Sequence, residues 1–204
     1  MKKWLVGIVI AIVALVAGVY LWSAQNGRQQ HSASRANTAS SKSTTESSKQ
    51  HKMLVVYYSN SGTTESAAKT IQKKTGADII KLQMSPDYPS DYSKLTVVAK
   101  RQIDRNQHPK ILNNIDFSKY STVFLGFPTW YHRPPMFINT FFEKYDLKGK
   151  TVVPFTTSMS SSIAVSRPYL KKMTANKQIV LQTGFRANET STITKYLKQH
   201  NFTK

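Results

Sequence analysis

The sequence predicts an α/β domain built on a doubly wound, five-stranded parallel sheet, preceded by a single transmembrane helix and a disordered linker. Three observations lead to this prediction. Apolar, strand-like runs alternate with amphipathic segments from residue 53 onward, as in parallel sheets with crossover helices. A long uncharged run lies at the N-terminus, and a polar stretch without periodicity separates it from the domain. We therefore expect an anchor at residues 1–24, a linker at 25–52 and one domain at 53–204.

The anchor is predicted from residues 4–22, which include no charged side chain. A helix of this length spans a hydrocarbon core of about 30 Å, and Trp4 and Trp22 lie where membrane interfaces favour aromatic rings. A cleaved signal peptide is the alternative, but residues 20–25 lack a small-x-small cleavage site. We expect a single-pass protein of the cell membrane that contacts lipid through this helix.

Membrane orientation is predicted from the lysines. Lys2 and Lys3 adjoin the apolar run, so the positive-inside rule keeps the N-terminus in the cytoplasm and places the domain outside the cytoplasm. Basic residues on the far flank weaken this asymmetry, so a cytoplasm-facing domain and secretion after cleavage remain alternatives.

Charge and composition exclude several classes. The formal net charge is +19, and residues 53–204 hold twenty-two basic and nine acidic residues. The basic residues are scattered and no nucleic-acid-binding signature occurs, so nucleic acid is not the expected partner; a positive surface beside anionic lipids or cell-surface polymers explains the charge. The chain has no cysteine, which excludes disulfides and thiolate chemistry. Residues 25–52 are too polar to form a packed core.

The first half of the domain is predicted as strand, helix, strand, helix, strand. The elements are a strand at residues 53–59, a helix at 64–75 that ends at Gly76 with Ala67, Ala68 and Ile71 inward, a strand at 77–82, a helix at about 91–107, and a strand at 122–127. Asp87 and Asp91 could form a pair of carboxylates, but acids beside Pro and Tyr residues are more often turn and cap residues.

The second half continues the alternation. A helix with an apolar face follows Pro134-Pro135, a strand covers 151–157, a helix lies near 168–173, a strand at 179–183 closes at Gly184, and a last helix at 189–199 is capped by Asn188. Doubly wound sheets bind ligands outside the carboxyl ends of the strands, where the strand order reverses. Three loops therefore converge there, at residues 59–64, 128–133 and 156–162.

The loop Ser59-Asn60-Ser61-Gly62-Thr63-Thr64 has the composition of a phosphate-binding turn. Unpaired N–H groups at a helix N-terminus bind phosphate, the hydroxyls add donors, and Gly62 allows close approach. An ordinary turn with an N-cap is the alternative. Neither a nucleoside-triphosphate loop nor a dinucleotide fingerprint occurs, so a mononucleotide is the expected ligand.

Trp130 and Tyr131 suit a flat heterocycle, because planar rings stack on aromatic side chains. Covering the edge of the core is the alternative role. With the loop residues they complete twelve candidate cofactor-binding positions: Ser59, Ser61, Gly62, Thr63, Thr64, Pro128, Thr129, Trp130, Tyr131, Thr156, Thr157 and Ser158.

The residues resemble a known family. The loop at 59–64 resembles the FMN phosphate loop of flavodoxins, and Gly126-Phe127-Pro128-Thr129-Trp130-Tyr131 with Pro134-Pro135 is similar to the G-x-P-x-W-[WY] segment of a flavodoxin-like family of bacteria. The likeness extends to residues 88–92 and 147–155 and covers nearly all of 53–204. It implies the flavodoxin-like fold and an FMN whose phosphate lies on the first loop and whose isoalloxazine ring is flanked by Trp130, Tyr131 and the 156–162 loop.

The chain departs from this family at residues 158–162. Relatives usually have a glycine-rich turn there, whereas this chain has Ser158-Met159-Ser160-Ser161-Ser162, whose side chains narrow the approach to the flavin edge. Two functions follow: a membrane-anchored FMN protein acting in electron transfer or as a small oxidoreductase, or a flavin-free interaction module at the cell surface. The redox partner expected for the first is a quinone, a flavoprotein or NAD(P)H.

Other constellations carry no chemistry. His132 could donate to a substrate, but a solvated loop histidine explains it as well. The other histidines lack metal-ligand spacing, so we expect no metal, and no catalytic side chain is predicted.

Overall fold

The computed structural model describes residues 52–204. The predicted anchor and all of the predicted linker except Lys52 lie outside the described residues. None of the helices formed by residues 52–204 has the length and apolar character needed to cross a membrane.

A parallel sheet forms the middle layer of the domain. Its strands are β1 (Lys52–Tyr57), β2 (Asp78–Lys81), β5 (Tyr120–Pro128), β6 (Thr151–Thr157) and a fifth position shared by β7 (Val180–Leu181) and β8 (Phe185–Arg186). The order is β2-β1-β5-β6-β7, with β8 also beside β6, and every pairing is parallel. The predicted doubly wound parallel sheet is confirmed. Its strand order reverses between β1 and β5.

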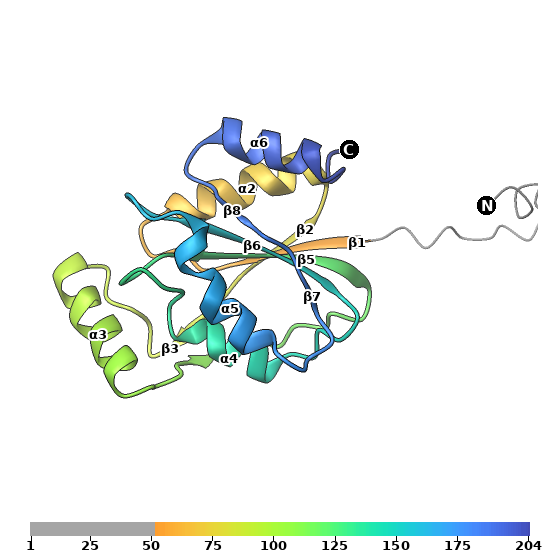
Figure 1. Cartoon of the computed structure of the whole chain (residues 1–204). Helices are drawn as coiled ribbons and strands as arrows, with labels where there is room; N and C mark the ends of the chain where they lie inside the picture. Colours follow the sequence, from red (N-terminus) through yellow and green to blue (C-terminus); the bar gives the residue numbers. More distant parts are fainter. Residues whose placement is uncertain (1–51) are drawn as a thin grey trace, which may run out of the picture. The chain divides into compact units, whose positions relative to one another are not determined.

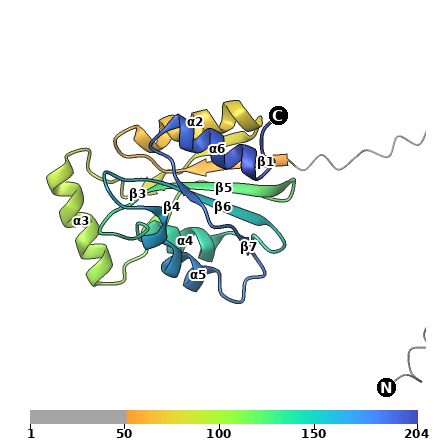
Figure 2. The ribbon, with the colours of Figure 1, turned by 45° about the horizontal axis from the view of Figure 1, so that its top comes forward.

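Helices cover both faces of the sheet (Figures 1 and 2). On one face lie α2 (Thr63–Thr75) and α6 (Thr190–Gln199), which bury Ala67, Ala68, Ile71, Ile193, Tyr196 and Leu197 as predicted. On the other lie α4 (Phe137–Lys144) and α5 (Arg167–Thr174), where four apolar side chains of α4 enter the larger core: Phe137, Ile138, Phe141 and Phe142. The periodicity of these segments dictates this burial, since each helix has one apolar face.

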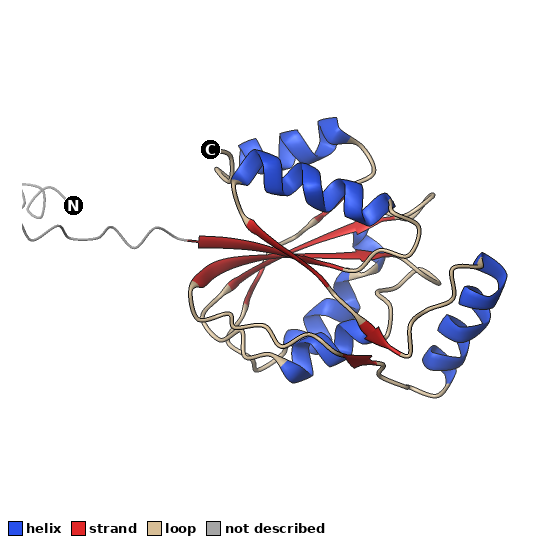
Figure 3. Ribbon diagram, turned by 180° about the vertical axis from the view of Figure 1, so that it is seen from behind, coloured by secondary structure: helices blue, strands red, loops and turns tan. Residues whose placement is uncertain are grey.

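The segment after β2 leaves the sheet. It forms β3 (Met84–Ser85), α3 (Tyr92–Asp104) and β4 (Lys110–Ile111), and β3 pairs with β4 in a separate two-stranded sheet that the sequence did not predict. Asp91 caps α3 by accepting a hydrogen bond from the Lys94 N–H at 2.8 Å, as its turn-and-cap assignment expected. Figures 1 and 3 show α3 beyond the carboxyl ends of the strands, rather than on a face of the sheet.

The fifth strand is interrupted because of Pro154. Val152 faces Leu181 and Phe155 faces Phe185, so the outer strand holds one residue more than β6 between these pairs. The Val152 and Thr156 carbonyls accept hydrogen bonds from N–H groups of the outer strand, so the backbone groups of residue 154, which lies between them, also point toward that strand. Residue 154 is a proline and has no N–H to donate. The extra residue is a bulge with Gly184 at φ +75°. The strand predicted at 179–183 is present as β7 but is shorter than expected, and β8 was not predicted.

The predicted cap of the last helix was also wrong. Glu189, not Asn188, is the N-cap residue of α6, and no side chain caps the helix. The side-chain oxygen Oδ1 of Asn188 instead accepts from the Ser158 N–H at 3.0 Å and from Arg186 Nε at 3.1 Å. Asn188 therefore joins the end of β8 to the loop after β6.

Candidate cofactor site

A cavity of about 570 Å³ opens at the carboxyl edge of the sheet, near the point where the strand order reverses. Eight of the twelve predicted residues line it: Ser61, Thr63, Pro128, Thr129, Trp130, Tyr131, Thr157 and Ser158. Gly62 lines an adjoining depression of about 400 Å³ between α2 and α6, which shares Ser61, Thr63 and Asn188 with the cavity. The structure thus brings the three predicted loops together.

The N-terminus of α2 forms one end of the cavity. Gly62 precedes the helix at φ +88°, and no side chain caps it. The first N–H groups of a helix have no intrahelical acceptor, so those of α2 can bind an anion. The Gly62 N–H itself donates to Ser59 Oγ at 3.1 Å, which closes the turn from within. The loop therefore forms a tight turn and leaves the helix end without a side-chain cap, and its contact with a phosphate stays a prediction.

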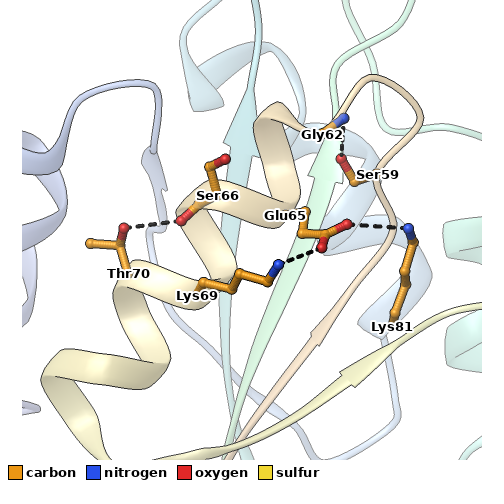
Figure 4. Close-up of polar contacts among 7 residues, drawn as sticks. All are labelled: Ser59, Gly62, Glu65, Ser66, Lys69, Thr70 and Lys81. Atoms are coloured by element: carbon orange, nitrogen blue, oxygen red, sulfur yellow. Dashed lines mark hydrogen bonds and ion pairs between the residues drawn. The ribbon is translucent and has the colours of Figure 1, made fainter.

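One acidic side chain lies in the first turn of α2, and its charge is neutralised by neighbours (Figure 4). The Glu65 carboxylate pairs with Lys69 at 2.7 Å and with Lys81 at 3.2 Å. Hydrogen bonds, first from Lys69 and then from Lys81, hold the pKa of Glu65 below its ordinary value. The three side chains together carry a formal charge of +1, so Glu65 does not oppose an anion at this helix end.

Three predicted residues support the loops from behind instead of lining the cavity. Ser59, Thr64 and Thr156 are buried, with exposed fractions of 7%, 2% and 0%. The Thr64 and Thr157 hydroxyls lie 2.7 Å apart and link α2 to β6. Thr156 Oγ1 lies 2.6 Å from Thr129 Oγ1 and donates to the Phe127 carbonyl at 2.9 Å, which links β6 to β5. A direct contact of these three with a cofactor stays a prediction.

Trp130 has a position fixed by other rings. Its ring centroid lies 4.9 Å from that of Tyr88, 6.2 Å from that of Tyr58 and 6.4 Å from that of Phe137, all in edge-on arrangements. This cluster belongs to the larger core, so Trp130 does cover the core's edge. It also lines the cavity, and its stacking on a flat heterocycle stays a prediction.

Burial has a further effect on the tyrosines of this cluster. It raises the pKa of both Tyr58 and Tyr88 well above the ordinary value. Both hydroxyls therefore stay protonated and donate, from Tyr58 to Asn60 Oδ1 at 3.0 Å and from Tyr88 to Gln102 Oε1 at 2.7 Å. Asn60 Nδ2 in turn donates to the Pro89 carbonyl at 3.1 Å, so the loop at 59–64 is tied to the segment before α3.

A two-residue turn presents Tyr131 and His132 to the cavity. Trp130 and Arg133 exchange two backbone hydrogen bonds of 3.1 Å, and the residues between them have φ of +50° and +55°. Both φ values are unfavourable for most residues other than glycine. The Tyr131 hydroxyl donates to the Thr96 carbonyl of α3 at 3.1 Å, and His132 Nδ1 lies 3.0 Å from Ser161 Oγ. The turn therefore bridges both walls of the cavity.

The serine-rich loop is held by its own backbone and by Arg186. The Arg186 guanidinium donates to the Ser158 carbonyl at 3.1 Å and to the Met159 carbonyl at 2.9 Å. Ser158 Oγ accepts from the Ser161 N–H at 3.0 Å, so this hydroxyl closes the turn inside the loop. The departure from a glycine-rich turn thus leaves an ordered loop rather than a free serine side chain in the cavity.

Sequence reasoning missed one wall of the cavity. Seven lining residues were not among the candidates: Tyr92, Leu95, Thr96, Ala99, His132, Met159 and Asn188. The first four come from α3. Their spacing of three and four residues identifies one helix face but does not say what that face covers.

The lining is uncharged and suits a planar organic ligand with an anionic end. No Lys, Arg, Asp or Glu is among the residues that line the cavity in the described domain. Within residues 52–204 no group of three His, Asp or Glu side chains is arranged to hold a metal ion. Aromatic faces and hydroxyls are the groups that the cavity presents, and α2 adds N–H donors at one end.

Comparison with known proteins agrees with this architecture. A family model described as Flavodoxin matches residues 52–201. A candidate flavoprotein from Bacteroides eggerthii is 33% identical, with a TM-score of 0.65 and coverage of 72% of this chain and 96% of that one. One from Bacteroides uniformis is 29% identical, with a TM-score of 0.62 and coverage of 72% and 97%.

A third solved structure, a flavoprotein from Lactobacillus acidophilus in complex with FMN, is 24% identical, with a TM-score of 0.62 and coverage of 72% and 98%. No curated protein sequence matches the chain at a significant level. The family match covers the described domain almost from end to end, and the chain therefore belongs to the flavodoxin family.

Proposed function

We propose that the domain binds FMN in the cavity at the carboxyl edge. One observation carries this proposal: a helix N-terminus without a side-chain cap and an aromatic turn border the same cavity of about 570 Å³. That volume lies within the range of about 300–1,000 Å³ typical of small-molecule sites. The complex of the Lactobacillus acidophilus flavoprotein with FMN supports the choice of ligand.

The cavity fits both ends of FMN. The phosphate suits the first turn of α2, where the helix dipole places about half a positive charge. The flat isoalloxazine ring suits Trp130 and Tyr131, and Ser158 and Met159 line the same cavity. Ser59, Thr64 and Thr156 would act by holding the loops in place, since their hydroxyls are bonded within the protein.

Bound FMN supplies the redox chemistry, as an electron carrier or as the hydride acceptor of a small oxidoreductase. The chain's own residues bind and orient the flavin, and no side chain is assigned a catalytic step. Three exposed apolar side chains stand at the mouth of the cavity: Tyr92 is 71% exposed, Tyr131 45% and Met159 93%. Such a mouth suits an apolar or protein redox partner, such as a quinone or another flavoprotein, better than a highly charged one.

Residues 4–22 are proposed to anchor the protein in the cell membrane, with the domain outside the cytoplasm. The uncharged apolar run and the flanking Lys2 and Lys3 support this arrangement. A domain outside the cytoplasm has no access to cytoplasmic NAD(P)H, which favours a quinone or a membrane flavoprotein as the partner.

The test is the visible spectrum of the full chain purified in detergent. We expect the absorption of an oxidised flavin and release of FMN on denaturation, or uptake of added FMN by the apoprotein. A colourless protein that takes up no FMN would refute the proposal and favour the flavin-free interaction module.

A further inference from the structure

Half of the domain's charge lies at one edge of the sheet. We define the amino edge as Lys52 with the segments that lead into the strands and the C-terminus, at 73–78, 116–120, 144–151, 176–180 and 198–204. Hydrogen bonds connect these segments, including Gly149 N–H to the Gln178 carbonyl at 2.9 Å and Lys204 N–H to the Lys74 carbonyl at 3.1 Å. The amino edge holds ten lysines and three aspartates, a formal charge of +7.

The opposite edge is nearly neutral. The carboxyl edge consists of the segments that follow the strands and surround the cavity, at 58–63, 82–91, 129–136, 158–166 and 186–190. These segments hold Arg133 and Arg186 against Asp87, Asp91 and Glu189. The helix α3, which also lines the cavity, adds Lys94, Lys100 and Arg101 against Asp104, so the formal charge of the carboxyl edge together with α3 is +1. The charge of the domain is therefore polarised along the strands, away from the cavity.

Helix dipoles do not cancel this polarity. Four helices, α2, α4, α5 and α6, run from the carboxyl edge to the amino edge and place about half a negative charge each at the amino edge. Together they subtract about 2 from a side-chain charge of +7. The amino edge stays strongly positive.

Most of these lysines are available to a partner. Lys119 pairs with Asp78 at 3.8 Å, and Lys144 and Lys150 donate to backbone carbonyls. The other seven make no ion pair with any residue of the described domain: Lys52, Lys73, Lys74, Lys148, Lys177, Lys198 and Lys204. All seven are exposed except Lys74, which is half-buried.

We propose that the amino edge rests on an anionic lipid surface and holds the mouth of the cavity away from it. Charge complementarity selects the partner, because lysines spread over several segments match a diffuse negative surface better than a small ligand. The chain enters the domain at Lys52, on this same edge, so the proposed tether joins the domain on its charged side. The proposal uses the tethering part of the proposed function and is independent of the flavin.

The orientation can be measured in the full chain reconstituted in vesicles. Because the chain has no cysteine, one introduced cysteine carries a fluorophore at a known place. Thr203→Cys labels the amino edge and Ser90→Cys the carboxyl edge, and both positions are exposed. Quenching by a headgroup-attached quencher is compared in phosphatidylcholine vesicles with and without phosphatidylglycerol.

We expect the Thr203 label to be quenched more strongly than the Ser90 label in the anionic vesicles only. Salt at about 1 M, where the Debye length is about 3 Å, should remove the difference. The triple variant Lys73→Glu/Lys148→Glu/Lys177→Glu should lose it as well, since each lysine near an anionic surface raises the docked population about fivefold. Loss of three lysines alone lowers it on the order of a hundredfold, and the three introduced glutamates add repulsion from the anionic surface.

A matched variant, Lys94→Glu/Lys171→Glu/Lys195→Glu, makes the same change of net charge at exposed positions outside the amino edge and should keep the difference. Equal quenching of both labels in anionic vesicles, or equal loss in the two triple variants, would overturn the proposal. The proposal would also be overturned if the vesicles left the fluorescence of both labels unchanged and soluble polyphosphate changed it, because the partner would then be a polymer. Flavin content, read from the visible spectrum of the same samples, separates these outcomes from a failure of FMN binding.

Discussion

A negative charge at the first residue of α2 gives the sharpest test of the phosphate site. Thr63 begins the helix, is exposed and lines the cavity, so Thr63→Asp places a carboxylate at the proposed phosphate position. Asp is favourable at a helix N-terminus by about 0.3–1 kcal/mol, so the free energy of unfolding should not fall. Ligand binding and folding are therefore expected to change in opposite directions.

The magnitude follows from Coulomb's law. A carboxylate about 4 Å from one phosphate charge costs between about 1 kcal/mol in water and about 4 kcal/mol at an effective dielectric constant of 20. The exposed position of Thr63 favours the lower half of this range, which is a loss of FMN affinity of about 5- to 50-fold. Thr63→Ser keeps the hydroxyl and should bind FMN as the unmodified protein does.

The assay is a fluorescence titration of the apoprotein with FMN and, separately, with riboflavin, which lacks the phosphate. Thr63→Asp should weaken FMN and leave riboflavin unchanged, and Gln107→Asp, the same charge in the exposed loop after α3, should affect neither. If FMN and riboflavin lose affinity equally, the phosphate does not lie at this helix end and the reasoning is refuted.

Three further predictions concern other parts of the domain. Trp130→Ala should lower the affinity for both FMN and riboflavin, since stacking of a base on an aromatic side chain contributes about 1–3 kcal/mol, whereas Trp130→Phe should restore most of it in the same titration. Unchanged affinity in the alanine variant would place the flavin ring elsewhere. Gly184→Ala should lower the free energy of unfolding in urea by at least about 2 kcal/mol, because it combines a positive φ with a Cβ that would clash with the Pro154 carbonyl oxygen. Gly149→Ala has a similar φ of +73° but nothing within 4 Å, so it should cost only about 1 kcal/mol, and equal losses would contradict the steric argument. Stability should fall as the pH rises above about 10, because burial raises the folded-state pKa of Tyr88 while the unfolded tyrosine ionises near 10. The slope should reach about 1.4 kcal/mol per pH unit for each such tyrosine and be smaller in Tyr88→Phe; a flat profile in urea unfolding would show that Tyr88 is solvated.

The elements that could be predicted from the sequence are those determined by residues close to one another in the chain. Gly76 ends α2 in the left-handed conformation, and the apolar spacing of α2, α4 and α6 identified their buried faces. The three loops were placed together because parallel strands share one carboxyl edge. The fold and the convergence of the three loops could thus be predicted from the apolar spacing and the topology of a parallel sheet.

The remaining features depend on contacts between distant residues. Asn188 is a residue type that often caps a helix N-terminus, but the Ser158 N–H and the Arg186 guanidinium donate to its side-chain oxygen Oδ1. The break in the fifth strand is set by Pro154 on its neighbour. The position of α3 follows from bonds such as that from Tyr131 to the Thr96 carbonyl. Each outcome requires knowing which segments meet, which periodicity does not provide.

The turn at Tyr131 and His132 is less stable than the same turn would be with other residues. A two-residue turn with positive φ at both positions is most stable as Asn-Gly, and residues held there by other contacts cost of order 1–3 kcal/mol each. A variant with Asn-Gly at these positions is expected to unfold at a higher temperature, but it would lose the hydrogen bond to the Thr96 carbonyl and the contact with Ser161. Selection for thermal stability alone would therefore erode the wall of the cavity at this turn, and an engineered thermostable form should leave both residues in place.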